Sequence, residues 1–376
     1  MMIPFNRASF DGNELAYLAQ AVRDGHVAGN GPFTKQAESM LEQRHGSGRS
    51  LLTTSCTHAL ELSALLLDMR PGEEVIVPAF TFVSTASAYM LHGGTPVFVD
   101  VREDTLNADP DLVEAAITDR TRAICIVHYA GVAATPERFR GLADRHGLVL
   151  IEDNAHGFSG TSGDQVLGTF GHLSTLSFHE TKNVTCGEGG AIHLNDLQLL
   201  QRAEILREKG TDRSRFLRGE VDRYTWVDIG SSWTLSDLLA GVLVGQLERF
   251  DAIQGRRASV WARYHRELAP WAGRCGVRTP RTPPGAGHTA HTYHLRFDDL
   301  ATRTRFIEHL RDRAVMAVFH YQSLHLSEVG TRLGGRPGQH PVTEDAADTL
   351  VRLPLYASLT DAEVDRILDA VSTFAP

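Results

Sequence analysis

The chain has few cysteines, and their spacing excludes a disulfide framework or a cysteine-rich metal site. The four cysteines, Cys56, Cys125, Cys186 and Cys275, are widely scattered and form no CxxC pair. No apolar run approaches the length of a membrane span, and the first residues lack the basic and apolar regions of a secretory signal. We therefore expect reduced thiols, no bound metal, no membrane association and a cytoplasmic location.

The chain also lacks an excess of basic residues. It has 37 Lys and Arg against 46 Asp and Glu, a formal net charge of −9. This balance disfavours nucleic acid and anionic membranes as partners, so an anionic substrate must be bound by a local site. Repeats and low-complexity tracts are absent as well. With 376 residues, 42% of them hydrophobic, the chain is long enough for a large domain and a smaller one.

Short apolar runs alternate with helical segments from about residue 50. The pattern predicts strands at 75–77, 96–100, 123–127 and 148–152, with helices at 83–91, 112–118 and 137–146. Continuous apolar strands separated by helices are typical of an α/β fold with a largely parallel sheet covered on both faces. Ligands of such sheets bind at the carboxyl ends of the strands, and Asp153 and His156 fall at one of these ends.

The remaining elements suggest a second, smaller α+β domain at the C-terminus. Helices are expected at 13–23, 33–44, 197–209, 238–269, 305–313 and 361–374, and strands at 292–297 and 316–321. We divide the chain into a large domain, residues 1–245, and a small domain, residues 246–376. The segment 210–234 reads as a polar loop of unusual length, and loops that long inside a compact domain are usually functional.

Two segments carry the chemistry. An apolar run ends in Asp153, and a second one delivers Ser177 and Lys182 just before the glycine-rich stretch 186–190. Pyridoxal phosphate (PLP) needs a lysine to form a Schiff base, a carboxylate to hold its pyridinium nitrogen protonated, and hydroxyl and N–H groups for its phosphate. Asp153 could also be a simple turn or helix cap, and Glu152 is the first alternative as the partner of the ring nitrogen.

A helix begins near Ser55, Cys56 and Thr57, and small polar residues there leave N–H groups free for an anion. Taken together, these segments resemble the DegT-type family of PLP-dependent sugar-nucleotide aminotransferases. The resemblance runs from the N-terminal Ile-Pro-Phe-Asn to Leu353-Pro-Leu355, nearly the whole chain. It implies PLP fold type I, the aspartate aminotransferase-like arrangement of a large and a small domain, and a homodimer with shared active sites.

The resemblance also implies roles for single residues. Lys182 would be the catalytic lysine, Asp153 the partner of the pyridinium nitrogen, and His156 the donor to the 3′-oxygen. Cys56 and Thr57, next to Ser55, would hold the phosphate through their N–H groups, and Ser177 through its hydroxyl. Phe82 would stack on the pyridine ring, with Phe80 as its competitor. Ser232 stands where the family commonly has an Asn that reaches the cofactor phosphate of the neighbouring subunit.

The closest resemblance is to enzymes that aminate C4 of dTDP-4-keto-6-deoxyglucose, and in particular to the 4-amino-4,6-dideoxygalactose-forming type. The shared phrases include Ser177-Phe-His-Glu-Thr-Lys-Asn183 and Tyr224-Thr-Trp-Val-Asp-Ile-Gly-Ser-Ser232. L-Glutamate would supply the amino group and a nucleotide sugar would receive it. The alternatives are amination of another keto-sugar nucleotide (a C3 ketone or another base) and a non-catalytic regulatory protein with the same fold. A related sugar dehydratase has histidine in place of the lysine, and Lys182 argues against that activity.

Two further groups of residues have a simple interpretation and a functional one. His288, His291 and His294 have a spacing that suits neither a helix face nor alternate strand positions, so we interpret them as structural or surface residues. His320 and Tyr321 could lie near the substrate. In the loop 210–234, Arg213, Arg215, Arg218 and Arg223 could bind the anionic substrates of a partner's site or merely offset nearby carboxylates.

Overall fold

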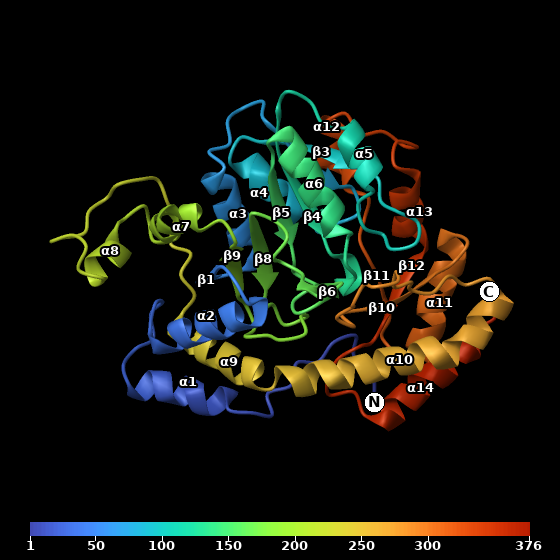
Figure 1. The fold of residues 1–376 in the computed structure, drawn as a ribbon. Helices are drawn as coiled ribbons and strands as arrows, with labels where there is room; N and C mark the ends of the chain where they lie inside the picture. The colour runs from blue at the N-terminus through green and yellow to red at the C-terminus, as the bar shows by residue number, and fades with distance from the viewer.

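A seven-stranded sheet forms the centre of the computed structural model, which describes residues 1–376 (Figure 1). Its strand order is β1-β9-β8-β5-β4-β2-β3, and only β9 runs opposite to the others. The strands are β1 (Arg49–Thr53), β2 (Glu74–Pro78), β3 (Thr95–Val99), β4 (Thr121–Val127), β5 (Val149–Asp153), β8 (Leu173–Ser177) and β9 (Gly190–Leu194). The mostly parallel α/β sheet predicted from the sequence is confirmed.

Apolar side chains on both faces of this sheet explain why its strands read as continuous hydrophobic runs. In β2, Val75 and Val77 join the core under α3 (Cys56–Leu66) and α4 (Ser84–Leu91), because successive side chains point to opposite faces. Ile76 joins the opposite core, with α5 (Pro110–Ala115) and α6 (Pro136–His146). A third cluster packs the sheet against α1 (Glu14–Arg23), α2 (Pro32–His45) and α9 (Asp237–Glu248).

A separate hydrophobic core of 25 buried residues lies in the C-terminal part of the chain, with Ile3 as its one N-terminal member. It is built on a three-stranded antiparallel sheet of order β10-β12-β11: β10 (Tyr293–Arg296), β12 (Leu350–Leu353) and β11 (Val318–Phe319). The long helix α10 (Phe250–Cys275) runs beneath both sheets and joins them (Figure 1). The separate core agrees with a small C-terminal domain, whereas the boundary at residue 245 stays a prediction.

The remaining elements are short or lie outside the two sheets. They are the helices α7 (Leu200–Arg207), α8 (Arg213–Leu217), α11 (Leu300–Asp312), α12 (Glu328–Arg332), α13 (Pro341–Thr349) and α14 (Asp361–Ser372), the 3₁₀ turns η1 (Tyr129–Gly131), η2 (Leu197–Leu199) and η3 (Leu324–Leu326), and the hairpin β6 (Thr161–Ser162) and β7 (Gln165–Val166). No helix is both long and apolar enough to cross a bilayer.

Several predicted elements differ from the structure for identifiable reasons. The helix expected over 238–269 is two helices, broken at Arg249, where the chain passes from α9 to α10. The strand expected over 316–321 is only β11, because the residues after Phe319 leave the sheet and line a cavity. The segment 210–234 contains the short helix α8, so it is not loop throughout. The predictions lacked β1, β9 and β12 as strands.

Candidate active site

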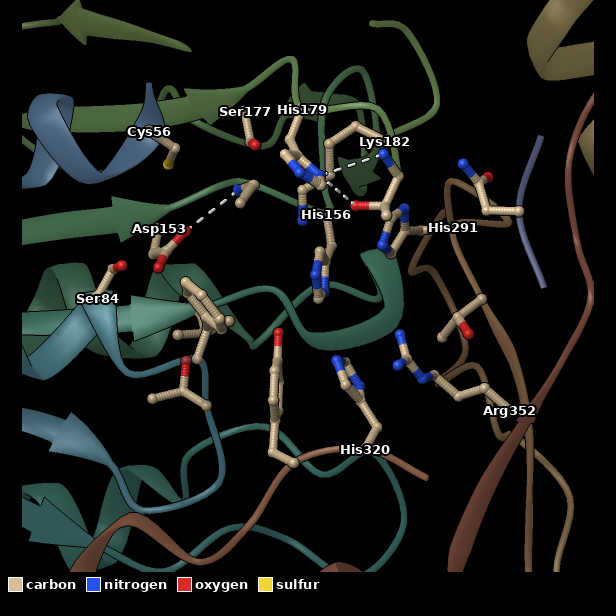
Figure 2. Close-up of a pocket in the computed structure, with 18 of the residues that line it drawn as sticks. Cys56, Ser84, Asp153, His156, Ser177, His179, Lys182, His291, His320 and Arg352 are labelled. Atoms are coloured by element: carbon tan, nitrogen blue, oxygen red, sulfur yellow. Dashed lines mark hydrogen bonds between the residues drawn. The ribbon is translucent and has the colours of Figure 1, made fainter. Parts of the chain in front are cut away.

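A cavity of about 860 Å³ opens at the carboxyl edge of the central sheet (Figure 2). Strands β1, β2, β5 and β8 all end at this edge. Their continuations deliver Ser55, Cys56 and Thr57, then Phe82, Asp153 and Ser177, all of which line the cavity. Lys182 and His156 line it too. The structure therefore brings together every predicted site residue except Ser232, from segments more than a hundred residues apart in sequence.

One end of the cavity is suited to an anion. Ser55 caps α3 by accepting a hydrogen bond from the N–H of His58 (3.1 Å), while the N–H groups of Cys56 and Thr57 have no acceptor in the chain. The Thr57 hydroxyl shares a hydrogen bond of 2.8 Å with Ser84, which also lines the cavity. Free N–H groups at the positive end of the helix dipole form a natural phosphate site, and the hydroxyl of Ser177 borders it.

Gly190 explains how β9 approaches this helix so closely. A Cβ atom at position 190 would lie 2.3 Å from the carbonyl carbon of Ser55 and 2.4 Å from the nitrogen of Cys56. Both neighbours are backbone atoms, so no side chain could move aside to make room. The glycine at the end of the 186–190 stretch thus sets the position of the α3 N-terminus relative to the sheet.

Asp153 and Glu152 are adjacent in β5 but point to opposite sides. Asp153 accepts a hydrogen bond of 2.7 Å from the Thr85 hydroxyl and one of 3.3 Å from the N–H of Ala155, and it faces the cavity. Glu152 is fully buried behind the sheet. It bonds His128 and the N–H groups of Gly168, Phe170 and Gly171 at 2.6–2.8 Å. Of the two carboxylates, only Asp153 is open to a ligand in the cavity.

The amine of Lys182 lies in the same cavity as Asp153. Burial lowers its pKa to about 8, against the opposing influence of Cys56 and Asp153, which favour the charged form. Burial also raises the pKa of Asp153, while the Thr85 hydrogen bond and the nearby Lys182 act in the opposite direction. An amine with a pKa near 8 is partly neutral at physiological pH, and a neutral amine is what nucleophilic attack and proton abstraction require.

Three imidazoles line the wall beside Lys182. The rings of His156 and His291 stack with centroids 4.1 Å apart, and the ring centroid of His320 lies 6.1 Å from that of His156. Burial, together with the cations Lys182 and Arg352, holds the pKa of each of them well below its usual range. The rings are therefore neutral, and the buried Nδ1 of His156 has no partner within the chain.

The two phenylalanines that could stack on the pyridine ring differ in their exposure to the cavity. Phe80 is buried in a cluster with Tyr129 and Tyr321, whereas Phe82 lines the cavity with 54% of its surface exposed. Of the two, only Phe82 has a face available to a ligand.

Ser232 is exposed and lies outside the cavity of its own chain. The carbonyl of the next residue, Trp233, accepts a hydrogen bond from the N–H of Thr54 (3.0 Å) near the start of α3.

The structure also places the histidine triplet and the loop arginines. His291 is not a surface residue as expected: it is buried, lines the cavity and shares a 2.9 Å hydrogen bond with Asn183. His288 instead packs on Trp261, and His294 lines a different cavity, so the three histidines do not form one site.

In the 210–234 segment, three arginines pair with carboxylates of their own chain: Arg213 with Glu208, Arg215 with Glu220, and Arg218 with Glu204 and Glu220.

Arg352 is a cavity residue that the sequence analysis did not single out. It stands on β12 in the middle of the apolar run Leu350-Val-Arg-Leu-Pro-Leu355 and points into the cavity beside His320 (Figure 2). Arg352 and Lys182 are the only arginine or lysine in the lining. One feature of the sequence could have identified Arg352: it is a single charged residue within an otherwise apolar strand. Such a charge is uncommon unless it has a partner or a function.

Comparison with known proteins gives one consistent answer. The model of the DegT/DnrJ/EryC1/StrS aminotransferase family matches residues 9–372. The fold is similar to that of Spr1654 from Streptococcus pneumoniae, assigned as a sugar aminotransferase and solved with its cofactor in the PMP form. The TM-score is 0.92 and the identity 27%, over 99% of this chain and 97% of that one.

Two solved structures from other bacteria are similar to the same extent. The aminotransferase TlmJ from Streptoalloteichus hindustanus has a TM-score of 0.91 and 29% identity, over 99% of this chain and 98% of that one. DesV from S. venezuelae, solved in complex with a ketimine intermediate, has a TM-score of 0.88 and 30% identity, over 97% and 95%. The chain thus belongs to the DegT/DnrJ/EryC1/StrS aminotransferase family, has PLP fold type I, and is an aminotransferase with PLP as its cofactor.

Proposed function

We propose that this enzyme transfers the amino group of L-glutamate to C4 of a dTDP-4-keto-6-deoxyhexose, giving a dTDP-4-amino-4,6-dideoxyhexose. The observation that carries the proposal is a set of uncharged polar side chains in the cavity lining. They are Asn6, His291, His320 and Gln322, and the two imidazoles are neutral. Neutral hydrogen-bond donors and acceptors suit the hydroxyl groups of a sugar ring. An apolar wall would not favour a hydroxylated substrate over an apolar one.

The residues around the cavity fit the cofactor. The open N–H groups of Cys56 and Thr57, the Ser55 turn and the Ser177 hydroxyl would hold the phosphate, and Phe82 would cover the ring. Asp153 would meet the ring nitrogen, and the unpartnered His156 would meet the 3′-oxygen. PLP, when bound, supplies the electron sink and carries the amino group between the two substrates.

Lys182 is the proposed proton carrier. Its amine is buried, has a pKa near 8 and lies in the same cavity as Asp153, so in the neutral form it can accept a proton from a substrate carbon. Asp153 stays fixed by the Thr85 hydroxyl, which keeps its carboxylate oriented toward the cavity while charge moves. Both groups are buried, and burial in a medium of low dielectric constant strengthens the electrostatic interaction between them.

The proposal includes a homodimer in which each subunit completes the other's site. The segment around α8 extends away from the body of the molecule (Figure 1). It exposes large apolar side chains on that extension, with Trp226 77% exposed, and with Leu217, Tyr224, Val227 and Ile229 also exposed. Several large apolar side chains exposed on one extension usually meet a partner, and the adjacent Ser232 would then reach the cofactor phosphate of the second subunit.

Product analysis tests this function directly. Purified enzyme with PLP, L-glutamate and dTDP-4-keto-6-deoxyglucose is expected to give one aminated nucleotide sugar, with one 2-oxoglutarate per product. NMR coupling constants at C4 then assign the gluco or galacto configuration. Lys182→Ala is the matched control and should show no multiple turnover, with a loss of several orders of magnitude. Amination only of a C3 ketone or of a sugar on another base would overturn the proposed substrate.

The main alternative to the proposed substrate is an amino-group acceptor that is not a nucleotide sugar. A solved synthase of 3-amino-5-hydroxybenzoic acid is also similar to this chain, with a TM-score of 0.88 and 26% identity over 99% of this chain and 98% of that one. The same scaffold therefore carries acceptors other than sugars. Turnover with a carbocyclic ketone and none with any nucleotide sugar would replace the sugar in the proposal.

A further inference from the structure

Arg352 is a cation in the cavity that has no anionic partner in the chain. No carboxylate lies within 4.0 Å of its guanidinium nitrogens, and its one hydrogen bond is to the carbonyl of Phe319 (3.2 Å). Its Nε is buried without an acceptor. By contrast, the buried Arg296 of the same sheet pairs with Glu103 at 3.0 Å and also with Asp345. A partly buried guanidinium without a carboxylate partner can bind an anion from outside the protein.

The small-domain sheet fixes the direction of this side chain. Arg352 lies on β12, the central strand, opposite His294 of β10 and Val318 of β11, so these three share one face. The neighbours Val351 and Leu353 belong to the small-domain core. Phe5 packs against the guanidinium, which lies 4.6 Å from the centre of its ring. The fork is therefore held in place before any ligand arrives, and little conformational entropy is lost on binding.

The position of Arg352 indicates which anion it meets. Arg352 lines the same cavity as Lys182 and lies beside His320 (Figure 2), whose ring centroid is 6.1 Å from that of His156. The guanidinium therefore lies near the reacting end of the cavity. The carboxylate of an α-amino acid is bonded to the carbon that loses its proton, and it must lie near this end. In a nucleotide sugar with a C4 ketone, the diphosphate is attached at C1, across the ring from the reacting carbon.

Resting on the proposed aminotransferase function, we propose that Arg352 binds a carboxylate of the amino-acid donor and so determines specificity for the first half-reaction. A planar guanidinium and a carboxylate match in a two-hydrogen-bond geometry that lysine cannot reproduce. The same guanidinium is released when the 2-oxo acid leaves, and the uncharged polar side chains of the lining then receive the hydroxylated acceptor. Arg352 makes no covalent bond and moves no proton.

The test separates the two half-reactions by cofactor absorbance in single turnovers. With Arg352→Gln, the apparent dissociation constant for L-glutamate is expected to rise about 100-fold, and with Arg352→Lys roughly 10-fold. The reaction of the aminated enzyme with the keto sugar nucleotide should change by less than about 3-fold. Arg303→Gln is the matched control, because Arg303 is a buried arginine of the small domain that packs on Phe319 but does not line the cavity.

A binding measurement makes the test independent of turnover. Calorimetry on the holoenzyme uses two unreactive probes: glutarate, which has two carboxylates and no amine, and dTDP, which has the diphosphate. Arg352→Gln should weaken glutarate binding by about 100-fold and leave dTDP binding unchanged. A loss of dTDP binding with glutarate unaffected would assign Arg352 to the nucleotide, and unchanged binding of both probes would remove it from substrate recognition.

These outcomes distinguish the inference from the proposed function. An enzyme that reacts with L-glutamate but aminates no dTDP-linked keto sugar would contradict the proposed function and leave the role of Arg352 intact. An enzyme that makes the aminosugar equally well with Arg352→Gln, at glutamate concentrations below saturation, would contradict only the role of Arg352.

Discussion

At the scale of single residues, the chemistry of this site depends on the burial of one amine. Lys182 lies in a protein interior where desolvation disfavours its charge, and the nearby Asp153 only partly offsets that effect. The resulting pKa of about 8 is well below the ordinary lysine value of about 10.4. Lysine can thus act as a nucleophile and a base near neutral pH without a separate general base beside it.

We predict that the cofactor-free enzyme binds PLP covalently with a pH profile set by Lys182. The protonated amine cannot attack, so the rate should rise about tenfold per pH unit below the pKa and level off above pH 8 to 8.5. The growth of cofactor absorbance between pH 6.5 and 9.5 measures this rate. Free Nα-acetyl-lysine provides the control for the titration of PLP itself. A rate that still rises steeply at pH 9.5 would show that Lys182 has an ordinary pKa.

Adjacent carboxylates can be told apart by what surrounds them. Glu152 and Asp153 differ by one position in β5, and the strand turns them to opposite faces. Glu152 is engaged by His128 and three backbone N–H groups, so it stabilises the 168–171 turn. Asp153 keeps an oxygen open to the cavity beside its bond to Thr85.

We predict that Asp153→Asn still binds PLP but slows the reaction with L-glutamate by about 100-fold or more. The amide keeps a hydrogen bond but cannot stabilise a protonated pyridine. Glu152→Gln is the paired control: the half-reaction rate should stay within about 3-fold, while the free energy of unfolding falls by about 1–3 kcal/mol. Single-turnover absorbance and urea unfolding report the two effects. The opposite pattern of rates would identify Glu152 as the partner of the ring nitrogen.

At the scale of elements, the anion site depends on the contact between β9 and the first turn of α3. Strand β9 is the one antiparallel strand of the central sheet, and its first residue, Gly190, pairs with Thr53 of β1 and with Ser177 of β8. The backbone at Ser55 and Cys56 lies where a side chain at position 190 would be. The position of the free N–H groups is thus set by the absence of one Cβ atom.

We predict that Gly190→Ala lowers both stability and cofactor affinity. The added methyl group meets backbone atoms that cannot rotate away, so α3 must shift, at a cost of about 1–3 kcal/mol in the free energy of unfolding. PLP binding should weaken at least 10-fold, because the phosphate site moves with the helix. Gly255→Ala in α10, where a Cβ meets no atom within 4 Å, should instead be neutral or stabilise by about 0.5–1 kcal/mol. Equal effects of the two substitutions would exclude a special role for position 190.

At the scale of the whole molecule, the extension around α8 is the part that a single chain does not explain. Three of its four arginines neutralise acids of their own chain, so they are poor candidates for substrate binding, and only Arg223 of this set lacks an ion pair. The exposed Trp226 and its apolar neighbours are the stronger indication of a partner surface. A second copy of the chain would cover them and bring Ser232 near the other phosphate site.

We predict that active sites are shared between subunits, and subunit mixing tests this. Lys182→Ala disables one side of the site, and Arg223→Glu combined with Ser232→Asp places negative charge where the partner's phosphate would lie. In mixed dimers of a symmetric pair, one site carries both lesions and the other carries neither. About a quarter of the wild-type activity should return after equal mixing and exchange. No recovery, with exchange verified by mass, would place the extension outside the partner's site.

The sequence by itself determined the layered α/β architecture and the core of the site. Continuous apolar runs indicated strands buried on both faces, and Asp153, Ser177 and Lys182 followed such runs directly. The carboxyl ends of parallel strands meet at one edge of the sheet, so local order along the chain predicts proximity in space. The resemblance then supplied the cofactor, and the family match over residues 9–372 confirms it.

Only the tertiary structure decided which residues from the small domain enter the cavity and in what charge state. Arg352, His291 and His320 come from segments more than a hundred residues beyond Lys182, and no local pattern relates them to the sheet edge. Only the tertiary structure also distinguishes Glu152 from Asp153. Glu152 is bonded to His128 and to the 168–171 turn on the opposite face of the sheet, so it cannot face the cavity. Charge state depends on burial and on neighbours in space, and both exist only after distant segments have packed together.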